Sequence, residues 1–432
     1  MMKTHHSKIL TTLVLLIALS TFNRAFSQSL PYAREVVKAL TSKEFYGRGY
    51  INKGDSIAAD YIKEHLRSFG AKPVGDSYYQ PFTMSVNTFP EPILLKIDDQ
   101  DKQAGIDYLV HPASSSISGT FGITRITLQD VIQQQQAIEK IRNSAGTFIV
   151  LDAIEKDDLN EYLATRLEKL EKYLLFNPGI PAVGTIILQA DKLTWFGSQE
   201  QLSKTVLMMS ASSFPEEAQE IQIEINAELL QDYQSQNVIA SIDGVNNDSS
   251  VVVIAHYDHF GKMGDALFPG ANDNASGTAM LLSLARYYSK NTPPYKMIFI
   301  AFGGEEIGLL GSDHFTEHPT FDLDSIKFLL NFDLAGTGDE GIQVVNGSVY
   351  RSRFDSLVAL NDKFDLLPEI RIRGKACNSD HCMFDHKDVP GFYMYTLGGI
   401  KAYHDVYDRF ETLPFTEFED YFKLITLFID SL

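Results

Sequence analysis

The sequence is poor in cysteine, in long apolar segments and in positive charge. Only 2 of its 432 residues are cysteine. No apolar run approaches the ~20 consecutive residues that a membrane-spanning helix requires, so we expect no membrane anchor of that kind. Lysine and arginine number 37 against 56 aspartate and glutamate residues, which gives a formal net charge of −19. Such an acidic balance argues against nucleic acid or an anionic membrane surface as a partner.

The two cysteines, Cys377 and Cys382, lie close together in the segment KACNSDHCMF. In an oxidising compartment such a pair is able to form a local disulfide, and two independent thiols are the alternative. Because the loop between them is short, a disulfide here adds little to global stability. Its expected effect is to fix a local turn.

Apolar and aromatic residues, in contrast, are plentiful. Hydrophobic residues make up 44% of the chain, with 28 Phe and 20 Tyr, and this excludes a disordered protein. A chain of this length exceeds a single ordinary core, so about two domains are expected. We found no internal repeat and no long linker. The composition therefore predicts a soluble globular protein.

The first residues have the features of a signal peptide. Basic and histidine residues precede the apolar run Ile9–Leu19, and Ala25-Phe26-Ser27 matches a small-residue cleavage site. A buried helix is the alternative. No cysteine follows the apolar run directly, so a lipid anchor is not expected. The pattern predicts cleavage near Ser27 and an exported protein, either periplasmic or secreted.

Three further regions follow the predicted signal peptide, residues 1–27. Residues 28–85 carry two amphipathic helical patterns. Residues 86–232 alternate short β-rich runs with polar helical pieces and contain few convergent acids or histidines, which indicates an inserted, smaller β-rich domain. Residues 233–432 alternate strands and helices, with a hairpin expected between Asn237–Gly244 and Val251–His256. The prediction is an α/β fold, a three-layer α/β/α sandwich with a mixed central sheet, plus the inserted domain.

Polar residues follow the buried strand pattern Val251–Ile254. The strand pattern ends on His256, Tyr257, Asp258 and His259, and the carboxyl ends of strands are where open α/β sheets bind ligands. A Gly/Asn-rich loop then supplies Asp273, directly before a predicted helix.

Further candidate ligands follow later strands. Glu305 and Glu306 come after the strand pattern Met297–Phe302, Asp333 comes after Phe328–Phe332, and His404 lies in a loop before the last helix. Adjacent carboxylates repel one another unless a cation is present. This oxygen- and nitrogen-rich set suits Zn²⁺. Because it exceeds what one tetrahedral zinc takes, two ions sharing a carboxylate fit better, and one acid of the Glu305/Glu306 pair remains free to act on water.

The motifs HYDHFG, GANDNASG, GGEEIGLLGS, NFDLAG and YHDVYD occur in this order. They resemble the signature of the secreted bacterial dizinc leucyl aminopeptidases, zinc exopeptidases with a phosphorylase/hydrolase-like fold. The family includes glutamate carboxypeptidase-like enzymes, glutaminyl cyclases and the non-catalytic transferrin receptor. The resemblance is strong over residues 236–432 and loose over 31–85. Residues 86–232 resemble a protease-associated domain through GTFIVLDA and GIPAVGTIIL.

This resemblance implies a two-zinc metallo-aminopeptidase that acts on peptides with a free N-terminus. Asp273 is implied to bridge the ions, with Glu306 and His404 on one ion and His256 and Asp333 on the other.

The resemblance also implies roles around the metals. Glu305 is the implied general base for a zinc-bridged hydroxide, and Asp258 is implied to accept the second imidazole N–H of His256. Tyr403 is implied to donate to the oxyanion. The Asp273-Asn274 peptide bond is implied to be cis.

Three alternative functions stay open at this point. A carboxypeptidase or dipeptidase on the same scaffold needs cations for a substrate carboxylate, for which Arg371, Arg373 and Lys375 are candidates. A glutaminyl cyclase uses one zinc. A non-catalytic, receptor-like or peptide-binding protein is the third.

Some conspicuous side chains have plainer interpretations. We interpret His259, His314 and His386 as structural, and Phe392, Tyr393 and Tyr395 as parts of a core strand. For His381 a substrate-side role and a structural one are equally open.

Overall fold

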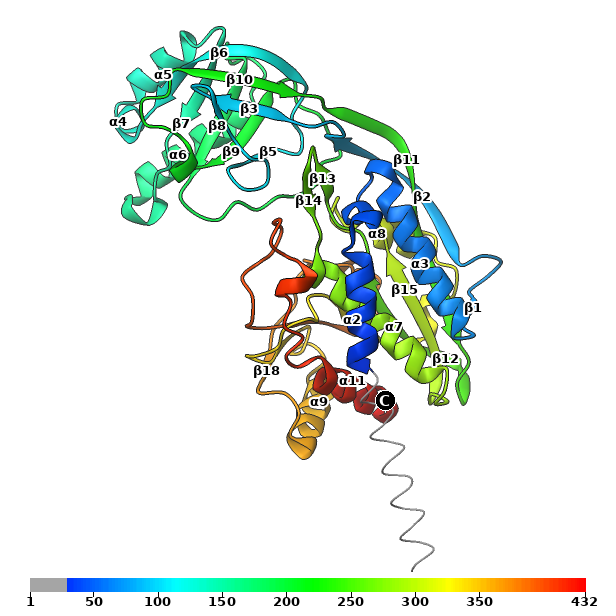
Figure 1. The fold of residues 1–432 in the computed structure, drawn as a ribbon. Helices are drawn as coiled ribbons and strands as arrows, with labels where there is room; N and C mark the ends of the chain where they lie inside the picture. Colours follow the sequence, from blue (N-terminus) through cyan, green and yellow to red (C-terminus); the bar gives the residue numbers. More distant parts are fainter. Residues whose placement is uncertain (1–28) are drawn as a thin grey trace, which may run out of the picture.

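A computed structural model describes residues 29–432 (Figure 1). The predicted signal peptide, residues 1–27, lies outside the described residues. Within residues 29–432, no helix combines the length and the apolar character that crossing a membrane requires.

A nine-stranded sheet forms the larger part of the molecule, with the order β1-β11-β15-β12-β16-β19-β17-β18 and β2 paired to β11. The central strands β15, β12, β16 and β19 are parallel, whereas β11 and β17 join them antiparallel. The sheet is therefore mixed, as predicted. Its strands are β1 (Lys72–Pro73), β2 (Tyr79–Thr88), β11 (Glu228–Ile242), β12 (Asn246–His256), β15 (Tyr295–Phe302), β16 (Ile326–Phe332), β17 (Ile342–Val345), β18 (Ile370–Ile372) and β19 (Gly391–Thr396).

Helices cover both faces of this sheet, which confirms the predicted three-layer α/β/α arrangement. On β12, Val251 and Val253 pack into one core, and Val252 and Ile254 pack into the core on the opposite face. Successive residues of a strand point to opposite faces of the sheet. All four side chains are fully buried because both faces are covered. The first face is covered by α2 (Ser29–Leu40), α3 (Gly54–Ser68), α7 (Gly277–Tyr288), α9 (Arg351–Phe364) and α11 (Phe418–Ser431), and the second by α8 (Leu310–Glu317) and α10 (His381–Asp385).

The predicted hairpin between β11 and β12 is wrong. The two strands are consecutive in the chain, but β15 lies between them and pairs with both. The reason is the apolar character of β15, whose last six residues, Met297–Phe302, are all buried. A strand that is apolar on both faces is stable only where both faces are covered, so β15 occupies an interior position.

A second sheet of eight strands, in the order β4-β3-β10-β6-β7-β8-β9-β5, forms what we call the smaller lobe. Its strands are β3 (Leu94–Ile97), β4 (Gln100–Asp101), β5 (Tyr108–Val110), β6 (Ile117–Ile126), β7 (Thr147–Leu151), β8 (Gly184–Gln189), β9 (Thr205–Ser210) and β10 (Glu220–Ile225), and its helices are α4 (Leu128–Ile132), α5 (Gln134–Arg142) and α6 (Glu161–Phe176). Figure 1 shows the long antiparallel pair β2 and β11 running from one sheet toward the other. The division of the chain at residues 86 and 232 stays a prediction, and both positions fall within this pair of strands.

The two lobes share a hydrophobic core. Phe260, Met263 and Phe268, in and beside the short hairpin of β13 (Gly261–Met263) and β14 (Ala266–Phe268), pack with residues of the smaller lobe, among them Trp195. Trp195 stacks on Phe268 with ring centroids 4.6 Å apart. This shared core fixes the smaller lobe beside the carboxyl end of β12.

Candidate metal centre

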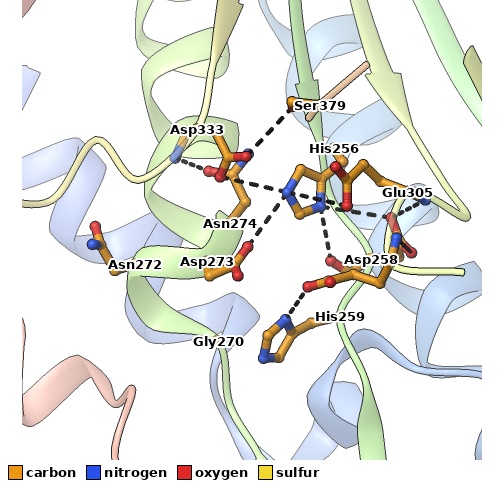
Figure 2. A network of polar contacts seen from close by, with 12 residues as sticks. His256, Asp258, His259, Gly270, Asn272, Asp273, Asn274, Glu305, Asp333 and Ser379 are labelled. Carbon is orange, nitrogen blue, oxygen red and sulfur yellow. Dashed lines mark hydrogen bonds and ion pairs between the residues drawn. The ribbon is translucent and has the colours of Figure 1, made fainter. Parts of the chain in front are cut away.

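Polar side chains meet at the edge of the large sheet where its central parallel strands end. β12 ends at His256, β15 is followed by Glu305 and Glu306, and β16 is followed by Asp333. These strands are parallel neighbours, so their carboxyl ends lie side by side. Figure 2 shows side chains from these strand ends pointing toward one another.

Asp273 and His404 reach the same edge from other segments. Asp273 lies in η5 (Ala271–Ser276), a π-helical segment that leads directly into α7. The Asp273-Asn274 peptide bond is cis, as the resemblance implies. His404 lies between β19 and α11, in a stretch without regular secondary structure.

The two carboxylate oxygens of Asp273 face different histidines. Asp273 Oδ2 lies 3.0 Å from His404 Nε2, which is itself 3.7 Å from Glu306 Oε2. Asp273 Oδ1 lies 3.4 Å from His256 Nε2, which is 3.5 Å from Asp333 Oδ1. The structure thus brings all the predicted ligand side chains together, with Asp273 between two groups of donors.

The donor set fits a divalent metal ion. Within residues 29–432, His256 forms one group of close ligand atoms with Asp273 and Glu306 and another with Glu305 and Asp333, each group lying within 4.8 Å. Asp333 Oδ1 is buried and has no hydrogen-bond partner, which is costly unless a cation or water meets it. Imidazole nitrogens and carboxylate oxygens without thiolates are ligands that zinc accepts.

The buried acids of the site have unusual proton affinities in the metal-free protein. Burial, reinforced by neighbouring carboxylates, raises the pKa of both Glu305 and Glu306 well above the ordinary value. For Asp273, burial raises the pKa, but hydrogen bonds from His256 and His404 outweigh it and hold the pKa well below the ordinary value. Like charges held this close favour either bound protons or a bound cation.

This proton balance predicts how the stability of the metal-free protein varies with pH. Acids whose pKa is higher in the folded than in the unfolded chain bind more protons when folded, so stability falls as pH rises toward the folded pKa. Glu305 and Glu306 belong to this class, and burial likewise raises the pKa of Asp380 to about 7. We expect the melting temperature of the metal-free protein to fall as pH rises from about 6.5, the ordinary histidine pKa.

Calorimetry between about pH 6.5 and pH 8 checks this expectation. Below that interval the sign reverses for His259, since burial lowers its pKa well below the ordinary value and protonation then opposes folding. Zinc-loaded protein is the control, because bound cations replace the protons and flatten the dependence. A melting temperature of the metal-free protein that rises across the interval would contradict this account.

Asp258 has contacts beyond the implied one with His256. His256 Nδ1 lies 3.3 Å from the backbone carbonyl of Asp258, whereas the nearer oxygen of its carboxylate is 3.8 Å away. The carboxylate instead accepts hydrogen bonds from Tyr50 Oη at 2.8 Å and from the backbone N–H groups of Glu305 and Glu306 at 3.2 and 3.4 Å. Asp258 therefore holds the loop that carries the two glutamates, and the implied contact of its carboxylate with the imidazole stays a prediction.

His259 is a buried, hydrogen-bonded histidine that contacts a predicted metal ligand. Its Nδ1 lies 2.6 Å from Glu306 Oε1, and the side chain is fully buried. This contact orients the carboxylate whose other oxygen faces His404. The available signal was its position in HYDH, three residues after His256 on the same strand end.

Sequence reasoning also missed Arg48, the last residue of η1 (Lys43–Arg48). The guanidinium is fully buried and donates to the carbonyl oxygens of Tyr257, Leu40, Pro269, Gly270 and Asp273 at 2.6–3.3 Å. The arginine thereby holds the loop that precedes Asp273, the predicted bridging ligand. The sequence signal for Arg48 was the pair of glycines that flank it, because a Cβ at Gly49 would lie 2.5 Å from the Cα of Gly261.

We expect Arg48→Met to lower the free energy of unfolding by about 3 kcal/mol or more, because several buried carbonyl groups lose their donor at once. Urea unfolding of the metal-free protein measures the change. Arg67→Met is the matched control, since Arg67 is 66% exposed and pairs with Glu64 on the helix surface. An Arg48→Met change as small as that of the control would refute the role of Arg48.

The remaining candidates lie around this centre. Tyr403 is 44% exposed, and its ring stacks on His404 with centroids 3.8 Å apart. His381 is buried, its Nε2 lies 2.8 Å from the carbonyl oxygen of Ala376, and its ring stacks on Tyr393. This surrounding favours the structural interpretation of His381.

Cys377 and Cys382 form a disulfide, so the first of the two alternatives holds. The bridge closes the turn that contains Ser379 and Asp380, both of which are fully buried. Ser379 Oγ accepts a hydrogen bond from Asn331 on β16 and lies 3.5 Å from Asp333 Oδ2. The disulfide thus fixes a turn beside the metal centre.

Comparison with known proteins places this centre in a recognised domain. Residues 237–429 match the model of Peptidase family M28. The chain is 42% identical over 110 residues to aminopeptidase YwaD of Bacillus subtilis, an alignment covering 24% of this chain and 23% of the relative. The chain spans about a fifth to a quarter of the length of the curated relatives it matches.

Solved structures share the fold over nearly the whole chain. The zinc aminopeptidase BSAP from Bacillus subtilis superposes with a TM-score of 0.66 at 19% identity, covering 93% of this chain and 94% of that one. The peptidase M28 precursor from Shewanella amazonensis gives 0.69 at 18% identity, covering 96% and 95%. Residues 237–429 therefore match the model of this peptidase family, and the chain shares the fold of these solved structures.

Proposed function

We propose that the protein is an exported zinc aminopeptidase that removes the N-terminal residue from peptides. The observation that carries the proposal is the placement of Asp273 between two histidines that face other acids, with Glu305 close by. The match to Peptidase family M28 supports the hydrolytic class. The relatives named as aminopeptidases support the reaction type, and the predicted signal peptide supports export.

We assign two zinc ions to the site. Asp273 would bridge them, Glu306 and His404 would complete one set of ligands, and His256 and Asp333 the other. Zinc, when bound, supplies Lewis acidity and lowers the pKa of a water molecule toward neutrality. The complete second set of ligands is the feature that favours this assignment over the one-zinc glutaminyl cyclase alternative.

Glu305 is the proposed general base. Its Oε2 lies 4.0 Å from His256 Nε2, and its side chain is mostly buried. Burial and neighbouring carboxylates raise its pKa, which suits a group that takes a proton from water and later returns it to the leaving amine. The backbone N–H of Glu305 donates to the carboxylate of Asp258, and this hydrogen bond holds the loop that carries Glu305.

Tyr403 is the proposed donor to the developing oxyanion. Burial, together with the charges of Asp273 and Glu306, raises its pKa, so the phenol keeps its proton near neutral pH. Stacking on His404 keeps the ring beside the ligands. A preorganised donor at this point stabilises charge that appears only in the transition state.

The relatives named as aminopeptidases favour a substrate with a free α-amino group over one held by its carboxylate. The cations considered for a substrate carboxylate are already paired. Arg371 meets Glu369 at 2.7 Å and Lys375 meets Asp385 at 2.7 Å, and Arg373 donates to the Tyr395 hydroxyl at 3.1 Å.

A panel of aminoacyl chromogenic substrates, each with a free amine and in its N-acetylated form, tests the proposal. We expect the zinc-loaded protein to cleave only the free-amine forms. Peptides analysed by mass spectrometry show which end is shortened. Cleavage from the C-terminus, or equal cleavage of acetylated substrates, would contradict the proposed function and favour the carboxypeptidase or dipeptidase alternative.

A further inference from the structure

The segment that carries His404 has little structure of its own. Between the end of β19 at Thr396 and η7 (Phe410–Thr412), the chain forms only bends and turns. His404 has a φ of 54°, in the left-handed region that a residue with a side chain rarely adopts. Contacts from outside the segment therefore add to the stacking of Tyr403 in fixing the direction of this imidazole.

The smaller lobe supplies those contacts through the chain that follows β8. The backbone N–H of Trp195 donates to the carbonyl oxygen of His404 at 2.8 Å. Lys192 Nζ donates to the carbonyl oxygens of Lys401 and Tyr403, each at 2.8 Å. The same ammonium group lies 2.5 Å from Asp405 Oδ2. One lysine thus binds the backbone on one side of His404 and a side chain on the other.

Trp195 is itself firmly held. Its indole N–H donates to the carbonyl oxygen of Val110 on β5 at 2.7 Å, and its ring packs on Phe268 and Phe260. Phe260 in turn lies edge-on to the imidazole of His404, with centroids 4.7 Å apart. The smaller lobe therefore meets His404 through a rigid aromatic cluster.

Further hydrogen bonds connect Lys192 to the loop that carries Asp273, the proposed bridging ligand. Asp405 Oδ1 accepts from the backbone N–H of Asp408 at 3.1 Å. The carboxylate of Asp408 accepts from the backbone N–H groups of Asn272 and Asp273, at 2.8 and 2.9 Å for the shorter contacts. Polar contacts through Asp405 and Asp408 thus connect Lys192 to the backbone of Asp273, and Lys192 also binds the carbonyl group that directly precedes His404.

We propose that Lys192 is a positioning residue through which the smaller lobe sets the metal site of His404, Glu306 and Asp273. Its ammonium group fixes the segment 401–405, so the imidazole meets the carboxylates at the right distance. The ion held by His256 and Asp333 depends less on Lys192, because those ligands lie at the ends of sheet strands. The inference rests on the proposed function and gives the smaller lobe a part in metal binding.

The test compares Lys192→Met and Lys192→Arg with wild-type protein and with Lys401→Met. Lys192 is 39% exposed, so its replacement leaves the hydrophobic core intact. Lys401 is an exposed lysine of the same segment that meets Lys192 through its carbonyl oxygen, which makes it the matched control. Zinc affinities from competition with a chromogenic chelator, melting temperatures of the metal-free proteins and turnover at limiting and at excess zinc are measured.

We expect Lys192→Met to bind one of two zinc ions at least about tenfold more weakly, in line with the loss of other groups that orient metal ligands. The affinity for the other ion should change less. The melting temperature of the metal-free protein should fall only slightly, because Asp405 loses its ion pair. Turnover should fall at limiting zinc and recover at excess zinc. Lys192→Arg should restore part of the affinity, and Lys401→Met should match wild type.

Two results would overturn the inference alone. They are equal zinc affinities in Lys192→Met and wild type, and equal weakening of both ions, which would make Lys192 a structural residue. Wild-type protein that binds fewer than two zinc ions, or that cleaves no free-amine substrate, would instead overturn the proposed function and this inference with it.

Discussion

Glu305→Gln is expected to lower the turnover number, kcat, by a factor of about 10³, the middle of the range for loss of a general acid or base. Glutamine keeps the size of the side chain but takes up no proton. Because Glu305 lies outside the proposed ligand sets, zinc content and melting temperature should stay those of the wild type. Steady-state kinetics on a free-amine substrate, with metal content measured on the same sample, checks both parts.

Glu306→Gln provides the comparison, since it differs by one position in the chain. Glu306 faces His404 and His259 at 3.7 and 2.6 Å, so its replacement should weaken zinc binding, and excess zinc should restore part of the activity. Glu317→Gln, on the exposed surface of α8, should change neither property. Substantial activity in Glu305→Gln, or loss of its zinc, would contradict the role given to Glu305.

Asp273→Ala is expected to remove both metal ions and with them all measurable activity. Asp273 directs one oxygen toward each histidine, so its loss deprives both sets of a ligand and leaves the remaining acids to repel one another. Losing a group that merely orients a ligand costs roughly 10–100-fold in metal affinity, and losing the shared ligand should cost more. Metal analysis after dialysis against zinc-free buffer measures the effect.

His404→Ala serves as the comparison for Asp273→Ala. It removes a ligand from only one proposed set, so it should retain about one zinc ion per chain under the conditions in which Asp273→Ala retains none. Circular dichroism of both variants checks that they fold. Retention of two ions by Asp273→Ala would show that this residue is no bridge.

The sequence predicted the layered fold and the meeting of the ligands for one physical reason. In a parallel sheet the carboxyl ends of strands share an edge, so His256, Glu306 and Asp333 must approach one another wherever their strands are neighbours. The strand order itself was less accessible. Local continuity suggested that β11 and β12 pair, whereas burial of both faces of β15 places that strand between them.

Residues that hold the ligands were harder to find, because their partners are distant in the chain. Arg48 binds carbonyl groups more than 200 positions away, and Lys192 binds a segment 209 positions further on. Neither contact follows from strand periodicity or from motif spacing. His259 lies in the HYDHFG motif, but nothing in that motif distinguishes its partner, Glu306, from a neighbouring acid.

The most direct test of the paired metal site is a zinc titration. Metal-free protein receives zinc in steps while the initial rate on a free-amine substrate is followed. We expect activity to reach its plateau at two zinc ions per chain, and Glu305→Gln to bind the same amount of zinc without activity. Full activity with one ion, or hydrolysis by the metal-free protein, would contradict this expectation.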